Sequence, residues 1–353
     1  MKRIEWIDVA KGIGIILVVM GHTSSITSDA ARMIFSFHMP LFFFLSGFVF
    51  SASKYKTLLS FVKRKAVTLL IPYVTFSVLT YGFWAVIGRK FEGQDVSLWK
   101  PLLGIVYSNG IDNWLVHGIT LWFLTCLFVV EVAFYLIFRN LSVKRVGFLL
   151  LVCSVIGYAD SLYSGFRLPW SIDVAFTAIV FYGLGYIAKK LQWNPAAYGS
   201  AQALLILIAA AAGNIGFDML NGSVPKVDMN KNQLGVYVYF YLSAICGIAA
   251  ILVLSSLVAR FGKMLTYLGR NTLVILAFHI ITFKLMKAVL TYGFQVSAEQ
   301  MEKSLVWSIG FTIASLLMLV PVNYFFTKYM PVMIGRPKKI GLNSQLQASA
   351  SQV

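Results

Sequence analysis

The stretch KGIGIILVVMGH, residues 11–22, carries an ammonium and an imidazole at the two ends of an otherwise apolar run. If this run is a helix, eleven residues advance the chain by about 16 Å and return His22 to within about 20° of the face of Lys11. An ionisable side chain at membrane depth is costly unless it faces a cavity or a partner. The pair therefore predicts a groove along the first helix that holds a long, thin ligand with a polar contact at each end.

The composition is that of an integral membrane protein. Of the 353 residues, 59% are hydrophobic and 12% are charged, whereas an average soluble domain has about 25% charged residues. The formal net charge of +17 describes short clusters between apolar runs, and we expect no nucleic-acid partner. Three cysteines lie within apolar runs without metal-ligand spacing, which argues against a disulfide framework or a metal site; they are Cys126, Cys153 and Cys246.

The first apolar run has one competing interpretation, a cleaved signal peptide, because Lys2 and Arg3 precede it. Glu5, Asp8 and Lys11 interrupt the entry to the run, and no clean small-residue cleavage site follows directly. We therefore expect this segment to be retained as a membrane span.

Apolar runs bounded by polar clusters predict an all-α membrane protein with about ten transmembrane helices. The expected spans are 9–27, 30–51, 66–87, 114–138, 146–159, 172–188, 199–217, 235–258, 271–292 and 305–327. The fifth is short for a hydrocarbon layer of about 30 Å. We expect one transmembrane domain, residues 1–330, and a cytoplasmic, disordered tail, residues 331–353.

Basic residues concentrate in alternate connections, which predicts the orientation. The set with most of them is taken as cytoplasmic, together with both termini. It contains Lys54, Lys56, Lys63, Arg64, Lys65, Arg139, Lys144, Arg145, Lys189, Lys190, Arg260, Lys263 and Arg270. Nearly all the acidic residues lie in the other set.

Seven motifs occur in one order along these spans. They are DxxKG from Asp8, Lys11 with His22, FFFLSGF at residues 42–48, KR followed by LLIPY at 63–73, LWFL at 121–124 with Glu131 beyond, FYGLGY from Phe181, and LGRNTLVILAFH at 268–279. Together they resemble the membrane-bound acyltransferase family 3, and within it the group similar to fucose 4-O-acetylases. The resemblance covers residues 5 to 290, most of the chain.

The resemblance implies a membrane O-acyltransferase. Such an enzyme takes an acetyl group from cytoplasmic acetyl-CoA, a substrate rather than a bound cofactor, and transfers it to a sugar hydroxyl outside the cell. The acceptor would be a polysaccharide or a lipid-linked glycan, and the location the bacterial cytoplasmic membrane. The resemblance also implies that His22 is catalytic and that Lys11, here in place of the more common arginine, contacts the donor with Lys63 and Arg64.

Further polar residues within the spans are candidates for supporting roles. Ser46, in the SG motif, is grouped with the donor-binding residues and also fits a close approach of two helices. Glu131 needs a cationic partner on another helix, and Asp173 could cap a helix. The remaining candidates are Asp8, His38 near His22, Trp122, Asn271 and His279; Ser46, Asn271 and Trp122 could each donate to an oxyanion.

Several alternatives stay open at this point. A transporter or flippase would also need ten spans with buried charges, and so would a non-catalytic subunit of an envelope complex. His22 could act as a general base or carry the acetyl group. Lys284 and Lys287 could extend to the membrane surface or meet an anionic acceptor, and His117 is expected to be a solvated loop residue.

Overall fold

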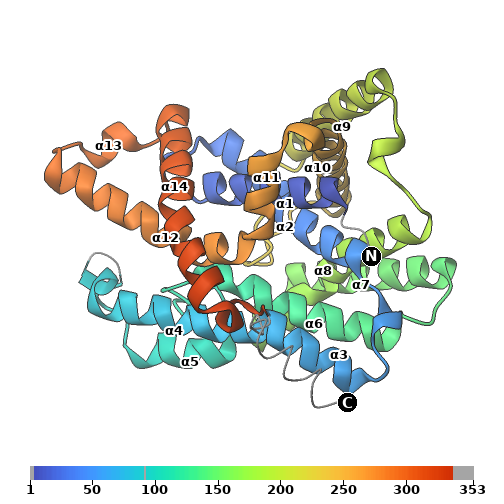
Figure 1. Ribbon diagram of the computed structural model, residues 1–353, viewed down its shortest axis with the longest axis horizontal. Helices are drawn as coiled ribbons and strands as arrows, with labels where there is room; N and C mark the ends of the chain where they lie inside the picture. The colour runs from blue at the N-terminus through green and yellow to red at the C-terminus, as the bar shows by residue number, and fades with distance from the viewer. Residues whose placement is uncertain (1–3, 91–92, 337–353) are drawn as a thin grey trace, which may run out of the picture.

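The computed structural model describes residues 4–90 and 93–336, which form a bundle of helices (Figure 1). Nine helical segments in this part of the chain are long and apolar enough to cross a membrane. An isolated antiparallel bridge joins Asp228 to Gln233. The predicted all-α, multi-pass membrane architecture is confirmed.

The helices follow the predicted spans closely. The main ones are α1 (Glu5–Gly21), α2 (Ser28–Val49), α3 (Leu58–Lys65), α4 (Ile71–Val86), α5 (Trp99–Tyr107), α6 (Trp122–Ile137), α7 (Val143–Tyr163), α8 (Ile172–Lys190), α9 (Ser200–Leu220), α10 (Tyr237–Val258), α11 (Lys263–Arg270), α12 (Thr272–Ala288), α13 (Ala298–Met301) and α14 (Leu305–Tyr329). A π-helical turn, Ala66–Leu70, makes α3 and α4 one continuous segment. The first predicted span is α1, a tenth apolar helix of 17 residues.

Three features differ from the sequence-based expectation. The fifth span is not short, because α7 has 21 residues. Four brief helices were not predicted, because they lie in segments assigned to loops or span edges; they are α3, α5, α11 and α13. The predicted tail begins inside an ordered turn, because Pro331–Ile334 form a 3-10 helix; residues 337–353 lie outside the described part of the chain.

Helix α1 lies at the centre of the bundle and packs against α2, α10, α11, α12 and α14. Its contact with α11 is close enough that only glycine fits at two positions. A Cβ atom at Gly12 would overlap the carbonyl oxygen of Leu265, and one at Gly269 would overlap that of Asp8. These glycines fix α1 against α11 and so fix the positions of Lys11 and His22.

The SG motif performs the same function between α2 and α8. A Cβ atom at Gly47 would overlap the carbonyl oxygen of Tyr182, and one at Gly185 would overlap that of Phe44. Ser46 donates to the carbonyl oxygen of Phe42 in its own helix, at 2.8 Å. The expected close helix approach is therefore present, and its contacts come from the glycines.

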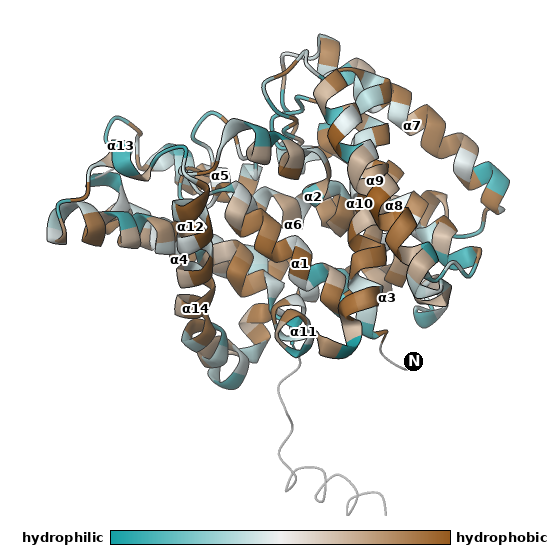
Figure 2. Cartoon of the chain, turned by 90° about the horizontal axis from the view of Figure 1, so that it is seen from above, coloured by the Kyte–Doolittle hydropathy of each residue, from teal (hydrophilic) through white to brown (hydrophobic). Residues whose placement is uncertain are grey.

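The outer surface of the bundle is apolar between two polar ends. Leu205 and Leu317 are 69% and 65% exposed, as expected for side chains that face lipid. Hydrophilic residues gather in the connections above and below the helices (Figure 2). We call the end that carries the start of α1 the basic end, and the opposite end, which carries His22, the histidine end.

Candidate active site

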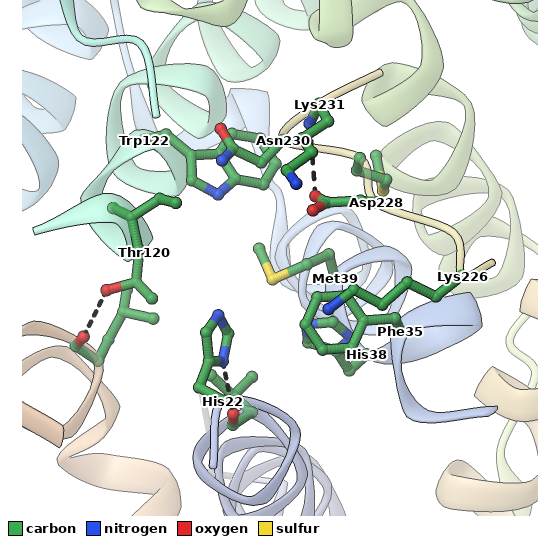
Figure 3. A pocket seen from close by; sticks show the side chains of 14 residues that line it. His22, Phe35, His38, Met39, Thr120, Trp122, Lys226, Asp228, Asn230 and Lys231 are labelled. Atoms are coloured by element: carbon green, nitrogen blue, oxygen red, sulfur yellow. Dashed lines mark hydrogen bonds between the residues drawn. The ribbon is translucent and has the colours of Figure 1, made fainter. Parts of the chain in front are cut away.

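His22 directly follows α1 and faces a cavity at the histidine end. Its Nδ1 lies 2.7 Å from the carbonyl oxygen of Val18. A carbonyl oxygen can only accept, so Nδ1 carries the hydrogen, and in the neutral ring Nε2 is left with a free lone pair. Figure 3 shows this second nitrogen directed into the cavity. The arrangement is that of a general base or a nucleophile with a fixed tautomer.

Two further histidines, His38 and His279, lie close to His22. The ring centroids of His22 and His279 are 5.2 Å apart, and those of His22 and His38 are 6.4 Å apart. His38 Nδ1 donates to Ile34 O and His279 Nδ1 to Ile275 O, both at 2.9 Å. The three rings are therefore held in one tautomer by the same contact with the preceding helical turn. Among the described residues, no group of three or more histidine, cysteine or acidic side chains is placed to hold a metal ion.

The cavity has a volume of about 200 Å³ and is built from five separate segments. Its lining includes Trp122 at the start of α6 and Leu276 of α12. One of these segments, the connection between α9 and α10, was not predicted, because its polar residues have the composition of an ordinary loop. That connection contributes Lys226, Asp228, Met229, Asn230 and Lys231.

The α9–α10 connection is held in place by specific hydrogen bonds. Asn221 uses both ends of its amide, donating to Leu234 O at 3.0 Å and accepting from Val236 N at 2.6 Å. Arg167 donates to Asn230 O at 2.9 Å and forms an ion pair with Asp173 at 2.9 Å. Asp173 does not line the cavity, but its partner Arg167 contacts Asn230, which does.

Of the three expected oxyanion donors, only Trp122 lines the cavity that His22 faces. Asn271 lies near the basic end, where it accepts a hydrogen bond from Arg336 at 2.9 Å and donates to Tyr267 O at 2.7 Å. Ser46 is likewise absent from the cavity lining.

Glu131 was expected to have a cationic partner on another helix, and this partner is Lys65, at 2.8 Å. This ion pair lies between α3 and α6, and the glutamate side chain is only 5% exposed. Lys65 therefore points inward, whereas its neighbours Lys63 and Arg64 are exposed. Asp8 forms a second ion pair, with Arg270 at 3.0 Å.

Two clefts open at the basic end. One, of about 690 Å³, lies between the start of α1 and the ends of α2 and α8, and its lining includes Asp8, Lys11 and Lys54. The other, of about 680 Å³, reaches the end of α6 and is lined by Lys56, Arg139, Lys189 and Lys190 with aromatic side chains. Lys189 and Gln192 line both clefts. Lys63 and Arg64 line neither of them.

A third cleft, of about 640 Å³, adjoins the histidine cavity and shares Ile119 and Lys231 with it. His117 lines this cleft and is only 6% exposed, so the expectation of a solvated residue is wrong. The loop folds back over α4, where His117 Nδ1 is 3.0 Å from Thr80 Oγ1. Burial lowers the pKa of His117 to about 4. Lys284 lines the same cleft.

The comparison with known families agrees with this architecture. A family model described as an acyltransferase domain, that of acyltransferase family 3, matches residues 4–324. The chain belongs to this family. The match includes α1 with Lys11 and His22, the histidine cluster and the clefts at both ends. Neither the search of curated proteins nor that of solved structures gives a significant match.

Proposed function

We propose that this acyltransferase family 3 member transfers an acetyl group from acetyl-CoA, bound at the basic end, to a sugar hydroxyl bound at the histidine end. One observation carries the proposal: α1 joins the two sites, with Lys11 in a basic cleft and His22 in the opposite cavity. The positive-inside rule then places the basic end in the cytoplasm. The acceptor would be an extracytoplasmic polysaccharide or lipid-linked glycan of a bacterial envelope.

The clefts at the basic end suit the anionic end of coenzyme A. Phosphate groups are favoured by clustered lysine and arginine side chains, and the two clefts present Lys11, Lys54, Lys56, Arg139, Lys189 and Lys190. Tyr135 and Tyr186 lie among them but are buried, and the Tyr135 ring stacks on Phe61 while the Arg139 guanidinium lies 4.3 Å from its centroid. The sequence-based assignment to Lys63 and Arg64 is replaced in this proposal by residues that line a cleft.

The reaction needs one base at the histidine end. His22 Nε2 accepts the hydroxyl proton as the sugar oxygen attacks the thioester carbonyl carbon, and the new C–O bond forms. When the tetrahedral intermediate collapses, the C–S bond breaks and the thiolate of coenzyme A takes the proton back from Nε2. A route through an acetyl group carried on Nε2 uses the same atom and gives the same products.

The test is release of coenzyme A by the purified protein in nanodiscs, with and without a bacterial polysaccharide extract. We expect release that depends on the extract and is abolished in His22→Ala. Lys90→Gln is the control, because Lys90 is exposed and lines neither the cavity nor the cleft beside it. If wild-type protein neither binds nor consumes acetyl-CoA with any extract, the proposal is rejected, and a transport or assembly role replaces it.

A further inference from the structure

The histidine cavity contains an ammonium group that nothing in the proposed chemistry uses. Lys226, from the α9–α10 connection, places Nζ 3.8 Å from the centroid of the Phe35 ring. Figure 3 shows its side chain extending into the space that His22 faces. His22 and Lys226 therefore line the same cavity, one from the end of α1 and the other from the α9–α10 connection.

The positive charge of Lys226 is only partly balanced by acidic groups of the protein. Within residues 4–90 and 93–336, no carboxylate oxygen lies within the 4.0 Å ion-pair limit of its Nζ. Asp228 acts on Lys226 electrostatically, but that carboxylate also accepts from the backbone N–H of Lys231 at 3.3 Å. Burial lowers the pKa of Lys226 despite Asp228. An anion brought into the cavity would supply the missing partner.

The adjoining cleft continues this pattern. Lys231 lines both the cavity and the cleft, and Lys284 lies further along the cleft wall, with Asp112 as its acidic residue. Three lysines therefore line a path from His22 outwards, at the end of the bundle that holds fewer of the chain's basic residues. The cavity of about 200 Å³ is small, while the cleft of about 640 Å³ has room for several sugar units.

We propose that the cavity and its adjoining cleft form an acceptor site for an anionic glycan, in which Lys226 binds a carboxylate or phosphate group near the hydroxyl that is acetylated. The role of this site in binding the acceptor rests on the proposed function, whereas the anion site itself is tested by binding alone. Lys226 is a specificity residue here, and His22 remains the base.

The experiment measures binding by calorimetry to the protein in nanodiscs, without acetyl-CoA. The probes are three hexasaccharides: one containing glucuronic acid, one carrying phosphate groups, and one neutral. We expect at least one charged probe to bind at least about ten-fold more tightly than the neutral probe, and added salt to weaken it. The better of the two charged probes identifies the anionic group as carboxylate or phosphate.

Three variants make the test specific. Lys226→Gln should weaken the charged probe about ten-fold and leave the neutral probe unchanged, because only the charged contact is lost. Lys226→Arg should retain most of the affinity. Lys90→Gln is the control, since Lys90 is exposed and lines neither the cavity nor the cleft.

Two sets of outcomes separate this proposal from the proposed function. Equal binding of all three probes, absence of binding by both charged probes, or no response to Lys226→Gln overturns the anion site. Selective binding without release of coenzyme A on addition of acetyl-CoA and the bound glycan supports the anion site and rejects acetyl transfer. Release of coenzyme A with neutral and charged glycans alike supports acetyl transfer and rejects the selectivity.

Discussion

The two ends of α1 present opposite kinds of site. At the basic end, Lys11 lies in a cleft of about 690 Å³ beside another of about 680 Å³, both rich in lysine. At the other end, His22 faces a cavity of about 200 Å³ with two more histidines close by. A wide basic cleft suits recognition of a large anion, whereas a small cavity with fixed tautomers suits chemistry. The contrast implies that binding of the donor and catalysis depend on different residues.

The sharpest test of that separation is His22→Gln. We expect kcat to fall by about 10²- to 10⁴-fold, because a positioned base is lost. Affinity for coenzyme A should stay within about two-fold of wild type, since His22 lies outside both basic clefts. The measurement combines steady-state turnover with direct binding of coenzyme A. A parallel loss of donor affinity would contradict the separation.

The second test addresses the ion pair between Lys65 of α3 and Glu131 of α6. Glu131→Gln leaves the ammonium of Lys65 without its carboxylate partner, which costs about 3 kcal/mol when one member of a largely buried pair is removed. We expect a lower melting temperature in detergent. Replacing both residues, Lys65→Met with Glu131→Leu, should recover most of the loss. Equal destabilisation by the single and the double replacement would show that the pair is not the cause.

The third test compares the clefts with the exposed basic cluster. Lys189→Gln should raise the KM for acetyl-CoA about ten-fold with kcat within about two-fold, because Lys189 lines both clefts. Arg64→Gln, at an exposed residue outside them, should change the KM less than about two-fold. If Arg64→Gln has the larger effect, the donor binds along α3, as the sequence alone predicts.

The smallest expected effect concerns pH at the histidine end. The pKa of Lys226 is lowered by burial, so its ammonium loses its proton below the usual lysine range. Binding of a charged glycan should therefore weaken as pH rises through that lowered pKa, and Lys226→Arg should move the loss to higher pH. His22, His38, Asp228 and Lys231 also line this cavity. Lys231→Arg is the control, and an unchanged profile in Lys226→Arg would assign the loss to another group.

Parts of the site were predicted from the sequence. The spacing of Lys11 and His22 predicted one groove along the first helix, because a helix has a fixed rise and rotation per residue. The structure places them instead in two cavities that share no lining residue. His38 was expected near His22 because a short connection links their helices, and the two rings do lie close together. Glu131 was expected to need a cation, because an isolated carboxylate is not tolerated in an apolar helix.

What the sequence did not predict depends on contacts between distant segments. His117 was expected to be solvated, but its loop folds over α4 and buries the side chain. Lys63, Arg64 and Lys65 read as one basic cluster, but a helix turns each in a different direction, and Lys65 alone reaches Glu131. Lys226 had no distinguishing signal, since a lysine in a polar loop is common and only the path of the loop brings it to Phe35.

The sequence by itself determined the membrane class, the order of the long helices, and the presence of a cation and an imidazole on α1. These properties depend on hydropathy and on helix periodicity, which are local. Only the tertiary structure decided which lysines line the clefts and which loop completes the cavity around His22. Those contacts join residues far apart in the chain, and they depend on close helix approaches such as Gly12 to Leu265 and on hydrogen bonds such as Arg167 to Asn230.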